Sequence, residues 1–174
     1  VDTAFYLSPE QVDRRTVVYS KKPEGVLSRA PDPGERGWGW SHIGQGHYVD
    51  GPRSSLSGGA GLVSTANDYA RFLQMLLNGG ELDAVRLLSP KSVQLMTVNH
   101  VGDLFPWAGC AGFGLGFQII EDLGAFGQPG SAGSYGWGGA YHSPYWVDPA
   151  AELVVVYLTQ LIPAGNLADQ DKLR

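Results

Sequence analysis

The chain has 174 residues and a mass of 18.6 kDa, which suffices for one domain with its own core. Its 12 Lys and Arg are outnumbered by 17 Asp and Glu, the net charge is -5, and no basic cluster exceeds a pair, so a nucleic-acid groove or an anionic membrane surface is not expected. The longest apolar run, Leu153–Leu158, is far below the ~20 residues that cross a bilayer. A soluble protein is expected, and its compartment, cytoplasmic or periplasmic/secreted, stays open.

Residues 1–60 lack hydrophobic periodicity and contain a strong turn signal at Pro31–Gly34. The sequence predicts an irregular loop region here, typical of a segment that wraps a larger body or frames a pocket. Its aromatic residues and histidines either contact a ligand or anchor the loop to a core; they are Trp38, Trp40, His42, His47 and Tyr48. Because His42 and His47 have no third ligand nearby in sequence, no metal site is expected.

Residues 61–110 form a predicted helical region. After Thr65, apolar residues recur at helical spacing from Tyr69 to Leu77, and Asn78-Gly79-Gly80 supplies a stop. Thr65 and Asp68 fit a capping box. A second helix is expected to begin after Ser89 as its N-cap, with Pro90 in the first turn, and to end near Asn99.

Residues 111–174 are expected to hold the sheet strands and the start of a C-terminal helix. Three strands are predicted, at Phe113–Ile120, Tyr141–Val147 and Leu153–Gln160, and Asp148–Glu152 suits a hairpin connection between the last two. Leu153–Leu158 does not alternate polar with apolar residues, which indicates a strand covered on both faces. The expected fold class is α/β of the α+β type, with an antiparallel sheet flanked by helices.

The segment Gly133-Ser134-Tyr135-Gly136-Trp137-Gly138-Gly139 is dense in glycine around a tryptophan. Such glycines remove side chains where a ligand or another backbone comes close, which indicates the edge of a site. If the strand continued, Trp137, Gly139 and Tyr141 would share one face and Ala140 and His142 the other, unless a glycine bulge reset the register.

A nucleophile motif is missing from the chain. No Ser-x-x-Lys, Gly-x-Ser-x-Gly, His-Glu-x-x-His or P-loop pattern occurs, and Cys110 is the only cysteine, which excludes an internal disulfide. Ser134 lies in an Ala-x-Ser-x-Gly variant of the nucleophile elbow, but a helix does not follow it. A turn serine is therefore favoured over a catalytic one.

The whole chain nevertheless resembles the serine hydrolases that share the fold of class C β-lactamases and DD-peptidases, especially their carboxylesterase branch. The resemblance lies in five segments, of which the second and last are long and specific: Asp2–Tyr6, Ser57–Phe72, Leu87–Pro90, Gly112–Phe117 and Gly133–Pro149. It implies a β-lactamase/transpeptidase-like fold of which residues 1–174 form a partial domain, the C-terminal half.

In that family a Ser-x-x-Lys helix supplies nucleophile and base, a tyrosine motif supplies a second proton-transfer group, and a Lys-Thr-Gly strand forms the far wall. Trp137-Gly138-Gly139 resembles the third motif in a Trp-x-Gly form, and the backbone N–H of Ala140 resembles the second oxyanion donor. Indole in place of lysine removes a cation that could pair with a substrate carboxylate, so neutral esters are expected. The alternative is that Trp137 merely packs under the sheet.

The resemblance implies a parent enzyme that cleaves ester or amide bonds through an acyl-enzyme, without a cofactor. Trp137, Gly138, Gly139 and Tyr141 are the expected substrate-binding residues, and Ala140 is the expected oxyanion donor. The expected partners are a small ester or amide substrate and the N-terminal half of the same fold, in cis or as a second chain; alone, this chain is expected to be inactive. The alternative function is a non-catalytic binding module that keeps the groove shape without the chemistry.

Overall fold

A computed structural model describes residues 2–22, 25–32, 45, 54, 56, 58–59, 61–105, 109–163, 169 and 172–173. The chain forms two compact units. The hairpin unit comprises Val1–Asp68, Gly139–Ser143 and Leu158–Asn166, and the sheet unit comprises Tyr69–Gly138, Pro144–Tyr157 and Leu167–Arg174. The backbone therefore passes from the sheet unit to the hairpin unit between Gly138 and Gly139, within the segment predicted to bind substrate, and returns after Ser143.

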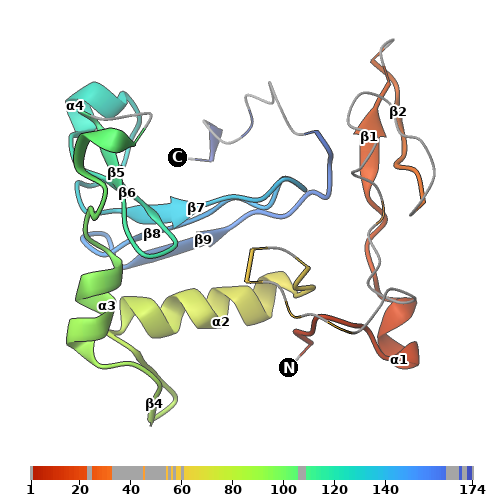
Figure 1. The fold of residues 1–174 in the computed structure, drawn as a ribbon, viewed down its shortest axis with the longest axis horizontal. Coiled ribbons are helices and arrows are strands. Elements are labelled where there is room, and N and C mark those ends of the chain that lie inside the picture. Colours follow the sequence, from red (N-terminus) through yellow and green to blue (C-terminus); the bar gives the residue numbers. More distant parts are fainter. Residues whose placement is uncertain are drawn as a thin grey trace. The chain divides into compact units, whose positions relative to one another are not determined.

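The sheet unit is built on five antiparallel strands in the order β5-β6-β7-β8-β9, so each strand pairs with the next one along the chain (Figure 1). The strands are β5 Ala111–Phe113, β6 Gln118–Ile120, β7 Tyr135–Trp137, β8 Tyr145–Asp148 and β9 Leu153–Val156. Helices accompany this sheet within the same unit, which confirms the α+β class expected from the sequence.

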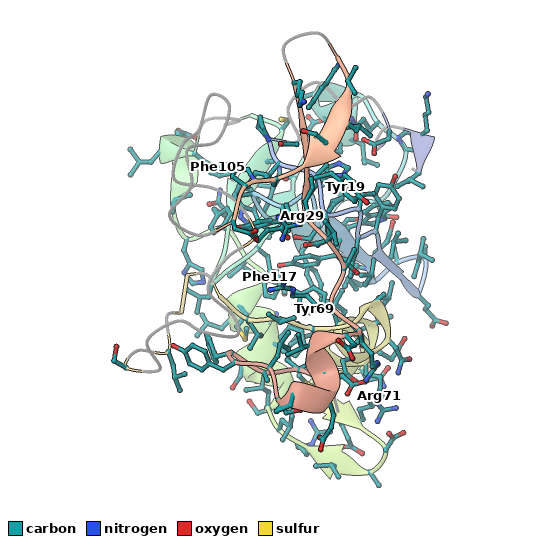
Figure 2. All side chains as sticks on the ribbon, turned by 90° about the vertical axis from the view of Figure 1, so that its right-hand side faces the viewer. Tyr19, Arg29, Tyr69, Arg71, Phe105 and Phe117 are labelled. Carbon is teal, nitrogen blue, oxygen red and sulfur yellow. The ribbon has the colours of Figure 1, made fainter. Side chains whose placement is uncertain are left out.

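Helix α2, Ala66–Leu77, covers one face of the sheet (Figure 1). It begins as predicted, since the backbone N–H of Asp68 donates to Thr65 Oγ1 at 3.1 Å. Its buried residues pack with strand residues in one hydrophobic core: Leu73, Met75 and Leu76 of α2 with Ile119, Tyr135 and Val147 of the sheet. The rings of Tyr69 and Phe117, both labelled in Figure 2, each meet the ring of Tyr145 edge-on. Apolar burial thus joins α2 to the sheet.

Helix α3, Pro90–Met96, also follows its predicted start, because Ser89 caps it by accepting a hydrogen bond from the N–H of Ser92 at 3.0 Å. It ends earlier than the expected Asn99. Asn99 Oδ1 instead accepts from the N–H groups of Val101 and Gly102, each at 3.0 Å, and closes a turn. The remaining short elements of the sheet unit are β3 Glu81–Leu82, β4 Val85–Arg86, η1 Gly102–Leu104 and α4 Leu123–Phe126. Across the described residues, every helix is too short or too polar to cross a membrane.

The prediction of one strand over Phe113–Ile120 is wrong, because this segment turns back on itself between β5 and β6. Gly114 N–H donates to the carbonyl oxygen of Phe117 at 2.8 Å, and Gly116 has a φ of +97° that a side chain would strain. The glycines that looked like strand positions close a hairpin.

The predicted strands Tyr141–Val147 and Leu153–Gln160 are too long. The first starts only at Tyr145, because Pro144 has no N–H for the ladder and His142 has a φ of +58° that reverses the chain. The second ends at Val156, and Gln160 also has a positive φ of 57°. The hairpin expected between these strands is present, with Asp148 pairing Leu153 at its base.

The hairpin unit contains regular structure where the sequence predicted an irregular region. Helix α1, Pro9–Val12, is followed by the antiparallel pair β1, Tyr19–Lys21, and β2, Leu27–Arg29. Gln45, which is 2% exposed, links the residue before β1 to the residue after β2. Its amide nitrogen donates to the carbonyl oxygens of Val18 and Ala30 at 2.8 and 2.9 Å. The predicted loop aromatics and histidines Trp38, Trp40, His42, His47 and Tyr48 lie outside the described residues, as does most of the predicted C-terminal helix.

Candidate active-site segment

Trp137 ends β7 and pairs in register with Tyr145 of β8, within the sheet unit. Its side chain is 41% exposed. The indole meets the ring of Phe113 edge-on, with 4.9 Å between centroids, and lies 6.3 Å from the ring of Phe105. Trp137 is thus part of a half-open aromatic cluster, formed by Phe105, Phe113 and Trp137, instead of being buried under the sheet.

The glycines around Trp137 have different neighbours. A Cβ at Gly136 would lie 2.2 Å from the carbonyl oxygen of Tyr145, so this glycine admits the backbone of β8. A Cβ at Gly138 would meet only Pro144 Cα, at an ordinary 3.8 Å. A Cβ at Gly139 would come within 2.6 Å of Ser143 Oγ, inside the hairpin unit. The close approach inferred from the glycines is therefore made by the protein itself at Gly136 and Gly139.

Ala140 sits in a β-turn of the hairpin unit. The carbonyl oxygen of Gly139 accepts a hydrogen bond from the N–H of His142 at 3.0 Å, which leaves Ala140 and Tyr141 as the two central residues. Ala140 is exposed, and within the described part of the chain its N–H has no acceptor. Because the strand ends at Trp137, the alternation of faces predicted for Gly139 to His142 does not apply.

Tyr141 is half-buried and packs against the small core of the hairpin unit, formed by Val18, Ala30 and Ile162. This packing anchors the turn. A substrate contact by Tyr141 stays a prediction.

Ser134 is a buried turn serine, 2% exposed. Its hydroxyl donates to the carbonyl oxygen of Ser131 at 2.7 Å and accepts from the N–H of the same residue at 3.3 Å. A turn precedes it and β7 follows it, which is the reverse of a nucleophile elbow. The turn reading of the sequence is confirmed.

Two tyrosines of the sheet, Tyr135 and Tyr145, have raised pKa values. Burial raises the pKa of Tyr135 to about 12, and burial together with the neighbouring hydroxyl of Tyr69 raises the pKa of Tyr145 further. Both phenols therefore stay protonated. Among the described residues, no three His, Cys, Asp or Glu side chains gather to hold a metal ion.

His142 is the one residue of the segment whose role the sequence did not suggest. It is only 2% exposed, and its Nδ1 is hydrogen-bonded to Thr159 Oγ1. The sequence signal was weak: a histidine two positions after the expected oxyanion donor.

Comparison with known proteins places these features in context. The family model described as Beta-lactamase matches residues 1–173. Protein Rv1367c of Mycobacterium tuberculosis is 35% identical over 93% of this chain, and a putative D-alanyl-D-alanine carboxypeptidase of Escherichia coli is 30% identical over 78%. The chain spans 40% and 29% of the lengths of these two relatives. The solved structure of EstCE1, a hydrolase with promiscuous acyltransferase activity, superposes with a TM-score of 0.79 at 26% identity, over 98% of this chain and 44% of that one.

Proposed function

Because the chain belongs to the Beta-lactamase family of serine hydrolases, we propose that its protein cleaves neutral carboxylic esters through an acyl-enzyme. In this proposal the N-terminal half of the fold, in cis or as a second chain, supplies the serine nucleophile and its base. The chain described here supplies the far wall of the groove, Trp137-Gly138-Gly139, and one oxyanion donor, the N–H of Ala140.

The proposed chemistry has two stages. The serine oxygen attacks the ester carbonyl, the carbonyl oxygen becomes an oxyanion, and collapse of this intermediate breaks the ester bond and releases the protonated alcohol. Water then attacks the acyl-serine, releasing the carboxylic acid and restoring the hydroxyl. A backbone N–H aimed at the oxyanion stabilises both transition states.

The observation that carries the proposal is the N–H of Ala140. This exposed residue lies in the turn that begins at Gly139, directly after Trp137 and Gly138, and among the described residues its N–H has no acceptor. An unpaired, exposed donor in a defined turn is available to a ligand. The similarity to a hydrolase with acyltransferase activity supports the same reaction class.

The aromatic cluster supports the substrate class. Trp137 stands where a lysine of the Lys-Thr-Gly motif would place a cation, and its neighbours Phe113 and Phe105 are apolar as well. A carboxylate placed there would lose hydration without gaining a charged partner. A neutral acyl or alcohol group would bury apolar surface instead.

The test compares a neutral with a negatively charged ester substrate. It uses the protein that contains this chain together with its N-terminal half. Two nitrophenyl esters of matched length are compared, a neutral butyrate and a succinate with a free carboxylate. We expect kcat/KM to favour the neutral ester by at least ~10-fold, and Trp137→Lys to shrink that ratio by a similar factor, since one charge contact is worth about 1.4 kcal/mol or more.

Trp137→Phe is the matched control, because it keeps an apolar ring and is expected to keep the preference. A wild-type preference for the acidic ester, or a ratio that Trp137→Lys leaves unchanged, contradicts the substrate assignment. If the protein binds the ester but neither turns it over nor forms an acyl-enzyme, the result would favour the non-catalytic binding module.

A further inference from the structure

His142 has a backbone conformation that its residue type disfavours. Its φ of +58° lies in the left-handed region, which glycine adopts freely and which a histidine adopts at a cost. The side chain is 2% exposed, within the hairpin unit. The buried imidazole therefore offers contacts at this position that a glycine, which adopts the same φ freely, would lack.

His142 contacts Thr159, in the same unit, through both its backbone and its imidazole. The carbonyl oxygen of His142 accepts from the N–H of Thr159 at 3.2 Å, and Nδ1 of the imidazole is hydrogen-bonded to Thr159 Oγ1. Backbone and side chain of one residue are therefore both tied to one partner.

Thr159 itself belongs to a segment that is fixed to β1. The N–H of Tyr19 donates to the carbonyl oxygen of Gln160 at 2.9 Å, and the N–H of Ile162 donates to that of Tyr19 at 2.8 Å. The anchor of His142 is thus part of the hydrogen-bonded body of the hairpin unit.

The anchored residue also closes the turn that contains Ala140. Since the N–H of His142 donates to Gly139 at 3.0 Å, the planes of the two intervening peptides depend on where His142 is held. We propose that His142 is a positioning residue, which orients the N–H of Ala140 for the oxyanion through its link to Thr159. This inference rests on the proposed function.

The test uses variants that separate backbone conformation from side-chain anchoring, made in the protein with its N-terminal half. His142→Gly keeps access to positive φ but removes the imidazole. His142→Asn also tolerates positive φ and keeps a short hydrogen-bonding group for Thr159. Thr159→Val removes the partner hydroxyl at nearly constant shape, and Thr159→Ser retains it. Thermal unfolding identifies variants that fail to fold.

With the neutral nitrophenyl ester, His142→Gly and Thr159→Val are each expected to lower kcat by at least ~10-fold with little change in KM, because an oxyanion donor acts in the transition state. The Asn and Ser variants should recover most of the loss. The double variant should lose no more than either single one, since both remove the same link. Full activity in Thr159→Val, or no recovery in His142→Asn, overturns the proposal.

A second readout separates this inference from the proposed function. Backbone ¹⁵N relaxation of Ala140 should report greater mobility in His142→Gly and Thr159→Val than in the Asn and Ser variants. If the wild-type protein cleaves no ester, the proposed function fails, and the positioning role is then supported by this pattern or overturned by an unchanged Ala140.

Discussion

Asp148 joins the β8–β9 turn to the turn that precedes β7. It is 5% exposed, and its Oδ1 accepts from the N–H groups of Ala150 and Ala151, each at 3.1 Å. Burial alone would raise the pKa of this carboxyl, but hydrogen bonds, among them those from Ser131, Ala151 and Ala150, outweigh burial and lower it. Asp148 is therefore a buried anion held by neutral donors.

Replacing Asp148 should reduce stability and change its pH dependence. Because the folded pKa is below the unfolded value of about 3.9, the ionised carboxylate stabilises the fold above that pH, and this contribution is lost as pH falls through the folded pKa. Asp148→Ala should lower the free energy of unfolding by about 1–3 kcal/mol at pH 7, because buried donors lose their acceptor. Asp148→Asn should lower the free energy of unfolding by less than Asp148→Ala does. It should also flatten the acid limb, which is the fall of the free energy of unfolding as the pH decreases.

Urea titrations at a series of pH values measure both effects. Asp103→Asn, at an exposed position in η1, removes one carboxylate away from this turn and is the charge-matched control. An unchanged acid limb in Asp148→Asn would contradict the assignment.

At the scale of the element, β7 occupies the centre of the sheet between β6 and β8. Gly136 pairs with Trp146 of β8, and a Cβ there would lie 2.8 Å from Trp146 Cα as well as against Tyr145. Trp146 is 7% exposed, and its own Cβ would lie 2.9 Å from that added Cβ. The strand that contains Trp137 therefore requires a glycine at position 136.

Gly136→Ala and Gly138→Ala should therefore differ sharply. The first should cost several kcal/mol, on the order of 3, or abolish folding, because backbone atoms cannot yield to the added methyl. The added methyl of Gly138→Ala would meet only Pro144 Cα, at 3.8 Å. Its free energy of unfolding should therefore stay within about 1 kcal/mol of the wild-type value. Thermal and urea unfolding of the pair measure the contrast, and equal losses would disprove the role given to Gly136.

At the scale of the whole molecule, both units leave large apolar side chains open to solvent. Leu153 on the edge strand β9 is 46% exposed, and Leu27 and Leu62 of the hairpin unit are 59% and 52% exposed. Open edge strands and apolar surface favour association with another chain segment. We propose that the N-terminal half of the fold covers part of this surface.

The isolated 174-residue chain should consequently self-associate and bind a hydrophobic dye, and it should show no ester burst. Co-expression with a Ser-x-x-Lys-bearing N-terminal half should give a one-to-one complex with a higher Tm and restored activity. Light scattering coupled to size exclusion measures the assembly state. If the isolated chain is a monodisperse monomer that does not bind the dye, this proposal is contradicted.

The helix starts could be predicted because capping is local. Thr65 and Ser89 each bond a backbone N–H three residues along the chain, so the sequence window contains both partners. The start of β8 at Tyr145 was mispredicted as Tyr141, because a strand boundary depends on which backbone lies alongside. Apolar and aromatic residues at 141–147 suit a strand equally well whether or not the chain turns at His142.

The fold class, the family and the importance of Trp137-Gly138-Gly139 could be predicted from the amino-acid sequence, since motifs and hydrophobic patterns are formed by neighbouring residues. The three-dimensional structure was needed to show that Gly139–His142 forms a turn in which Ala140 is exposed, and that the ring of Trp137 packs with those of Phe105 and Phe113. It also decided that His142 is tied to Thr159, 17 positions away. Such contacts join residues far apart in sequence, and they form only when packing of the core brings their backbones together.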